Sequence, residues 1–195
     1  MKMTTRDRIR ASALALFAEK GYAATPTQEI CRRAGITKPV LYYHFKNKEH
    51  LYRHIVLEAH SELLRDLTAA ASRGDSARER LGNVLGADFG FTMRNPALSS
   101  VLFRMVFSPQ KEDPAIDFVG LGLNWLSVIQ GVAREGVRRK ELSCRPDELA
   151  IALLGVDIIY SMSYLLQGRP KLDRRLARRV VQLLVDGCRP EVTAR

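Results

Sequence analysis

Helical periodicity constrains the fold of this chain more than any other feature, because apolar residues recur every three or four positions along most of its length. In the first such segment Ile9, Ala13, Leu16 and Phe17 fall on one face of a helix. No stretch of the sequence alternates apolar and polar residues over the length of a strand. The pattern predicts an all-α protein with about nine helices and no sheet.

Glycine and proline residues mark the expected ends of these helices. Gly21 follows the first helix, and Pro96 and Pro146 stand at the starts of later ones. Gly136 is a candidate break inside the seventh helix. The expected helices cover residues 5–20, 26–34, 38–44, 48–72, 76–94, 96–107, 115–140, 146–167 and 172–188.

The composition is that of a globular protein in a reducing compartment. Hydrophobic residues make up 46% of the 195 residues, which is enough to bury a core and argues against disorder. The three cysteines, Cys31, Cys144 and Cys188, are far apart and odd in number, and with no signal peptide in view we expect a cytoplasmic protein. Residues 149–166 are apolar enough to resemble a membrane span. Asp157 near their middle favours a buried helix or a subunit interface instead, so no membrane is expected.

The positive charge is concentrated at the N-terminus. Residues 1–54 hold eleven Lys and Arg against four Asp and Glu, whereas the remaining residues hold twenty against seventeen. A basic excess confined to a short segment is typical of a surface that binds a polyanion such as DNA, although a chance skew of solubilising charge would look the same.

The segment of residues 25–48 has the pattern of a helix-turn-helix. Thr25 is placed to cap a helix with Pro26 at its first position, Gly35 provides a tight turn, and Thr37 begins a second short helix. Tyr42 and Tyr43 are adjacent, so both cannot face inward, which argues against a plain three-helix bundle. The second helix of such a motif enters the major groove of DNA.

The residues from Ala34 to Glu49, AGITKPVLYYHFKNKE, are similar to the signature of the tetracycline-repressor (TetR) family. Gly21-Tyr22 and the segment of residues 25–30 fit that family's entry into the second helix, so the resemblance covers roughly residues 5–60. Two positions depart from the pattern: Pro26 stands where the family more often has Thr or Ser, and Cys31 replaces a small alanine.

The resemblance implies a set of DNA contacts and an inward-facing pair, Leu41 and Phe45. Thr37, at the start of the recognition helix, is included among the DNA contacts. The residues expected at phosphates are Thr25, Thr27, Tyr42, Tyr43 and Lys48, and those expected at or near base edges are Gln28, Lys38, Pro39, Val40 and His44.

The remaining helices form a body rich in aromatic residues and methionine, which an ordinary core also requires. The resemblance implies an effector pocket there, and Asp88 and Asp157 are candidates for orienting a polar or cationic group in it. The expected pocket residues are Phe89, Met93, Phe103, Phe107, Trp125, Tyr160 and Tyr164.

The last two expected helices are apolar over much of their circumference, so each needs two apolar partners. The resemblance implies that they form the interface of a C2 homodimer, with Leu153, Val156, Leu183 and Leu184 in it. The expected domains are a DNA-binding head, residues 1–47, and an effector-binding and dimerisation body, residues 48–195.

Other chemistry finds little support in the sequence. His50, His54 and Glu58 share one helix face but lack a metal-binding pattern, so neither a metal nor a cofactor is expected. Nucleotide-binding and nucleophile motifs are absent from the sequence, which argues against an enzyme.

The resulting hypothesis is a homodimeric transcriptional regulator, a repressor released from a palindromic double-stranded DNA operator by a small apolar or amphipathic effector. An architectural or non-specific DNA-binding protein is the alternative. The sequence leaves open activation instead of repression, the operator, the regulated genes, and the identity and existence of the effector.

Overall fold

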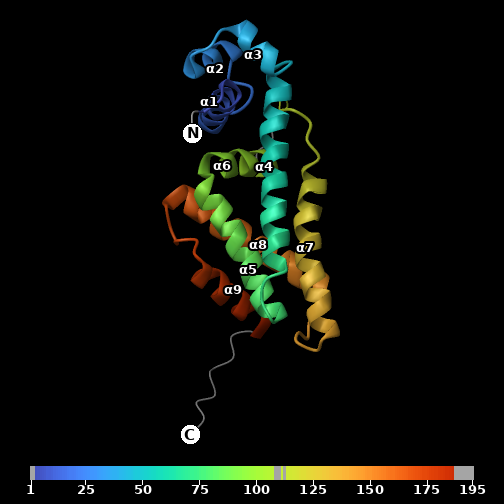
Figure 1. Ribbon diagram of the computed structural model, residues 1–195. Coiled ribbons are helices and arrows are strands. Elements are labelled where there is room, and N and C mark those ends of the chain that lie inside the picture. The colour runs from blue at the N-terminus through green and yellow to red at the C-terminus, as the bar shows by residue number, and fades with distance from the viewer. Residues whose placement is uncertain (1–2, 108–110, 112, 187–195) are drawn as a thin grey trace. The chain divides into compact units, whose positions relative to one another are not determined.

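The computed structural model describes residues 3–107, 111 and 113–186. It confirms the all-α prediction, because this part of the chain forms nine α-helices and no strand (Figure 1). The helices are α1 (Thr5–Lys20), α2 (Thr27–Ala34), α3 (Lys38–His44), α4 (Lys48–Ala71), α5 (Ala77–Arg94), α6 (Pro96–Phe107), α7 (Phe118–Arg138), α8 (Pro146–Gln167) and α9 (Arg174–Asp186).

Most helix boundaries lie within three residues of their predicted positions, and the differences have local causes. Helix α2 begins one residue later than expected, because Pro26 and not Thr25 occupies the N-cap position. Helix α7 runs past Gly136 without the expected break. Glycine serves packing at this position, because a Cβ atom there would lie 2.5 Å from that of Ala77. This glycine therefore permits a close approach of α7 to α5. The predicted end of the last helix, Cys188, lies outside the described residues.

The chain divides into two compact units. The first comprises residues 1–62 together with 95–118, and the second comprises residues 63–94 together with 119–195. Helix α4 contributes its first part to one unit and its last turns to the other. The expected functional boundary after residue 47 stays a prediction.

In the first unit α1 packs against α2, α4 and α6. The predicted apolar stripe of α1 is buried, as are Leu51 and Ile55 of α4. At the C-terminal end of α1, the Arg104 guanidinium of α6 donates a 2.9 Å hydrogen bond to the carbonyl of Ala18. The rings of Phe17 and Tyr52 meet edge to face with centroids 5.0 Å apart.

In the second unit α5 and α9 pack closely, because glycines of α5 face the α9 backbone. A Cβ atom at Gly82 would lie 3.7 Å from the Cα of Arg178, and one at Gly86 would lie 3.9 Å from that of Arg174. The core of this unit also takes in α7 and α8, with Leu85, Ile129 and Leu153 among its buried residues.

Helix α8 is long and apolar enough to cross a membrane by length and composition, and 28% of its most apolar 18-residue window is buried within the structure. The buried side includes Leu153 and Asp157, and it faces the core of the second unit. The other side carries exposed apolar residues, which are Ile151, Ile159 and Leu166.

Candidate nucleic-acid interface

The turn between α2 and α3 fixes the geometry of the candidate interface. Gly35 has φ 64° and ψ 44°, a left-handed conformation in which glycine is free of Cβ strain. The next residue, Ile36, donates its N–H to the carbonyl of Cys31 at 3.0 Å, which closes the end of α2. Helix α3 then starts with Pro39 in its first turn, where a missing N–H breaks no helical hydrogen bond.

Helix α3 has one inward and one outward side. Leu41 and the following Phe45 are buried in the core of the first unit. On the outward side Tyr43 is 85% exposed and Tyr42 is 46% exposed, and Lys38 is exposed beside them. A side chain that is apolar or aromatic and left in water on a short helix indicates a contact surface, because burying it would otherwise stabilise the fold.

The charge around α3 is positive and available. Helix α3 has no acidic residue in its first turn, and neither Lys38 nor Lys46 forms an ion pair within the described ranges. By contrast Lys20 is paired with Glu29 at 2.6 Å, and Arg33 with Glu19 at 2.8 Å. Cations without an acidic partner therefore lie at the exposed helix, as a polyanion-binding surface requires.

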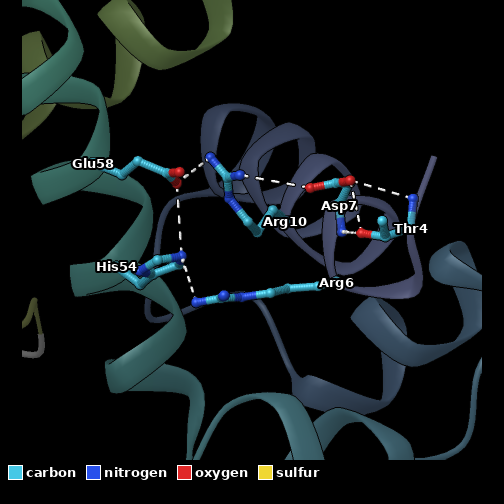
Figure 2. A network of polar contacts seen from close by, with 6 residues as sticks. All are labelled: Thr4, Arg6, Asp7, Arg10, His54 and Glu58. Atoms are coloured by element: carbon cyan, nitrogen blue, oxygen red, sulfur yellow. Dashed lines mark hydrogen bonds and ion pairs between the residues drawn. The ribbon is translucent and has the colours of Figure 1, made fainter. Parts of the chain in front are cut away.

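A polar network holds α1 against α4 and so supports this surface (Figure 2). The Nε2 atom of His54 lies 3.1 Å from the Arg6 guanidinium and 3.6 Å from the Glu58 carboxylate, which also pairs with Arg10. The guanidinium of Arg6 lies over the ring of Phe45 at 5.6 Å, next to the end of α3. Burial lowers the pKa of His54, and the nearby Arg6 and Arg10 lower it further against the opposing effect of Glu58. A neutral His54 can accept a hydrogen bond from Arg6.

Comparisons with known proteins agree with this geometry. The family description "Bacterial regulatory proteins, tetR family" matches residues 9–55, which contain the two helices and their turn. The chain is 31% identical over 108 residues to "Probable HTH-type transcriptional regulator YttP" of Bacillus subtilis (strain 168). This match covers 54% of the chain, and the chain spans about half, 52%, of the length of that relative.

A solved structure extends the likeness over nearly the whole chain. A bacterial regulatory protein in the tetR family from Rhodococcus RHA1 is similar with a TM-score of 0.77 and 27% identity, over 95% of this chain and 97% of that one. Residues 9–55 therefore match the tetR family, and the whole chain shares the fold of a regulator of that family. FadR from Bacillus subtilis, solved in complex with stearoyl-CoA, shares the fold with a TM-score of 0.75 and 18% identity, over 93% of this chain and 98% of that one.

One of the phosphate contacts predicted from the tetR-family pattern needs correction. The side chain of Thr25 is fully buried, and its hydroxyl donates a 2.7 Å hydrogen bond to the carbonyl of Gly21. The hydroxyl therefore stabilises the loop before α2 and is not free to bind a phosphate. The sequence pattern did not predict this burial, because a threonine at the start of a helix can equally be a cap, a phosphate ligand or a buried turn residue.

Lys48 is also engaged within the protein. Its ammonium donates to the carbonyls of Tyr22 at 2.9 Å and Thr25 at 3.1 Å, and it lies 4.1 Å from the centre of the Tyr22 ring. Burial lowers the pKa of Lys48. Because two of its three N–H groups are used internally, Lys48 ties the loop before α2 to the start of α4.

The other predicted DNA contacts stay predictions, and the structure leaves most of them accessible. Thr37, Pro39, Val40 and Gln28 are exposed, and the half-buried members are Thr27 and His44. Lys46, which the site prediction left out, is exposed directly after α3. Its signal in the sequence was only its charge and its nearness to the recognition helix.

The predicted pocket residues divide between the two units. Phe89, Met93, Trp125, Tyr160 and Tyr164 all belong to or pack against the core of the second unit, where the rings of Phe89 and Tyr160 lie 6.1 Å apart. Phe103 and Phe107 belong to α6 in the first unit, and their rings stack at 6.3 Å.

A groove of about 630 Å³ in the second unit lies along α5, and none of the predicted pocket residues lines it. Its lining is polar and includes Arg73, Arg94 and Arg174, with Arg94 paired to Asp66 at 2.9 Å.

The predicted dimer residues also differ in their placement. Leu153 is 0% exposed and lies in the core of its own unit, so its assignment to a subunit interface was wrong. Val156 and Leu184 are half-buried, and Leu183 is 52% exposed. Ile159 of α8, which the dimer prediction did not include, is 66% exposed.

Proposed function

We propose that the protein is a homodimeric transcriptional regulator of the cytoplasm that binds a palindromic DNA operator through α3 and is released from it by a small effector. The observation that carries the proposal is the outward side of α3, where Tyr42, Tyr43 and unpaired Lys38 are exposed on a helix held by a buried underside. A short exposed helix of this kind fits the major groove, and its tyrosines can reach flanking phosphates.

The experiment that tests DNA recognition is selection of bound sequences from random duplex DNA, followed by affinity measurements on the selected site. We expect a palindrome whose half-sites are one or more helical turns apart. Binding with a steep dependence on salt and little preference among sequences would instead support a non-specific DNA-binding protein.

Lys38→Ala tests whether the recognition helix reads bases. If Lys38 contacts a base edge, the variant loses about 1–3 kcal/mol of binding and its preference relaxes at one position. The matched control is Lys171→Ala, which removes an exposed lysine from the second unit. Uniform weakening across all sequences would make Lys38 a phosphate ligand, and unchanged binding would remove it from the interface.

The partner proposed for the exposed side of α8 is a second copy of this chain. Ile151, Ile159 and Leu166 of α8 and Leu183 of α9 leave apolar surface in water at the end of the chain. Gly155 has open space around its Cβ position, which allows another helix to approach closely. Two copies related by a two-fold axis would bury the same residues on both sides.

Ile159→Glu tests this interface without disturbing the core. We expect the variant to sediment as a monomer and to bind a palindromic site weakly, because each half-site is then bound independently. Ser127→Glu, at an exposed position of α7, is the control for adding a charge. A dimer of unchanged affinity in the Ile159 variant would rule out this face.

Release by an effector requires a ligand that binds one conformation of the dimer better than another. A linkage of about 1–3 kcal/mol would change operator affinity roughly 5- to 150-fold. FadR from Bacillus subtilis was solved in complex with stearoyl-CoA, which supports a small-molecule ligand for a regulator of this fold. The test is operator affinity with and without a ligand that binds the body, and repression is distinguished from activation by where the selected site lies relative to the promoter.

A further inference from the structure

We propose that the second unit binds a ligand with a protonated amine head and an apolar tail, and that Asp88, Asp157 and Ser161 hold the amine. The inference deepens the effector part of the proposed function and rests on it for its regulatory meaning. Binding of the amine itself can be measured without DNA, so the two proposals can fail separately.

Three helices bring a polar cluster into an otherwise apolar core. Asp88 comes from α5, Trp125 from α7 and Asp157 from α8, and all three side chains are buried. The indole Nε1 of Trp125 donates a hydrogen bond to the carboxylate of Asp88. Asp88 and Asp157 are hydrogen-bonded to each other, so the two carboxyl groups share a proton.

Two atoms of this cluster have no hydrogen-bond partner in the described part of the chain. They are Oδ1 of Asp157 and Oγ of Ser161, which lie one turn apart on the same helix. Buried polar atoms nearly always have a partner, so an unpartnered pair marks a place where a further group belongs. Oδ1 of Asp157 accepts a hydrogen bond and the hydroxyl of Ser161 can accept or donate one, so a group with several N–H donors can satisfy both atoms.

The charge of the cluster indicates which donor fits. Burial raises the pKa of both carboxyl groups, that of Asp88 to about 6 and that of Asp157 further above its ordinary range. Above pH 6 Asp88 is therefore mostly ionised, so the pair carries negative charge at pH 7.5. Within the described residues, no lysine or arginine forms an ion pair with either carboxyl.

An unpaired charge in an apolar core is unfavourable unless a counter-charge arrives. A primary ammonium brings one positive charge and three N–H donors, enough to satisfy both unpartnered oxygens and to neutralise the pair.

The surroundings favour an organic amine over an inorganic cation. Phe89 directly follows Asp88 and Tyr160 comes three residues after Asp157, and the centres of their rings lie 6.1 Å apart. The residues Met93, Leu126 and Tyr164 are half-buried against the same core. Aromatic faces attract cations, and apolar side chains accept an aliphatic tail. The negative charge would repel a carboxylate head at the same point, so a free fatty acid is disfavoured there.

The test uses three probes that differ only in the charge of the head group: octylammonium, 1-octanol and octanoate, each titrated into the full-length protein at pH 7.5. Trp125 is the chain's only tryptophan and touches Asp88, so its fluorescence reports on the site directly. Isothermal titration provides the affinities. We expect octylammonium to bind at least about tenfold more tightly than the other two, since a charge-assisted hydrogen bond is worth that much.

Asp88→Asn keeps an acceptor for Trp125 and removes the charge, and we expect it to abolish the preference for octylammonium. The matched control is Asp147→Asn, which removes a carboxylate from an exposed site on α8. Ser161→Ala is a second variant that leaves the charge in place and should weaken octylammonium by a smaller factor. Circular dichroism melting verifies that each variant is folded.

Equal affinity for the three probes, or tighter binding of octanoate, would overturn the inference and leave ordered water as the occupant of the site. The same would follow from an unchanged octylammonium preference in folded Asp88→Asn. Failure to find an operator would instead count against the proposed function. It would not affect the result for amine binding, which is measured without DNA.

Discussion

The buried carboxyl pair predicts an unusual dependence of stability on pH, and Asp88→Asn is the variant that reveals it. The pKa of Asp88 is about 6 in the folded protein against an ordinary value of 3.8. Between these values the folded state keeps a proton that the unfolded state has already lost. Stability from this group is therefore greatest at low pH, falls as the pH rises through 3.8 to 6, and stays low above that range.

The magnitude follows from the same two values. The gap between 3.8 and about 6 corresponds to about 3 kcal/mol at 25 °C, and full burial means that solvent does not screen it. Asparagine has the shape of aspartate and cannot ionise, so Asp88→Asn escapes this cost. We expect the variant to match the natural protein near pH 4 and to exceed its unfolding free energy by up to about 3 kcal/mol at pH 7.5.

The assay is urea unfolding without ligand at fixed protein concentration, followed by Trp125 fluorescence at pH 4, 5, 6 and 7.5. Other carboxylates shift the stability of both proteins alike, so the difference between the two proteins is the quantity to follow. Asp147→Asn, at an exposed position, should differ from the natural protein by less than about 0.5 kcal/mol throughout. A difference for Asp88→Asn that does not change between pH 4 and 7.5 would refute the assignment of a buried charge.

Two further predictions concern contacts that the sequence did not reveal. Lys48→Met leaves the carbonyls of Tyr22 and Thr25 without their donor and should destabilise the head by about 1–3 kcal/mol. The measurement is hydrogen exchange across residues 21–25, with Lys46→Met as the exposed control. Unchanged exchange would leave Lys48 with a role at phosphates alone. Gly136→Ala places a methyl group 2.5 Å from Ala77 and should cost about 1–3 kcal/mol in thermal or urea unfolding, whereas Gly131→Ala in the open part of the same helix should stabilise by about 0.5–1 kcal/mol. Equal effects of the two glycine variants would contradict the close approach.

The head could be predicted from the sequence in some detail, because its signals are local. Glycine at a left-handed turn, proline in a first turn and an apolar stripe of period 3.6 each fix a short stretch of backbone independently of the rest. The pattern could not predict which partners a polar residue contacts where a loop meets a helix. Thr25 and Lys48 bond to backbone carbonyls that only the folded loop brings to them.

In the body the helices could be predicted from the sequence, but the faces that they bury could not. Helix α8 is apolar on nearly every side, so its period does not distinguish Leu153, in the core, from Ile159, in water. The decision depends on which sides α5 and α9 cover, and the close packing of those helices depends on glycines whose role appears only in three dimensions. Asp157, by contrast, could be singled out from the sequence, because a single charged residue in an otherwise apolar helix is costly to bury without a partner.

Helix α4 connects these observations, because it is one continuous helix whose two parts are anchored in different cores. Its first part is fixed to α1 by Leu51, by Tyr52 against Phe17 and by the contact of His54 with Arg6. Its last turns contribute Leu67 to the core that contains the carboxyl pair. A ligand that neutralises the pair removes an unfavourable charge from that core alone, and it can alter DNA binding only if the conformations of α4 differ in how well they accommodate the ligand. Coupling between the amine site and the recognition helix therefore requires that the second core repack around Leu67 when the charge is neutralised.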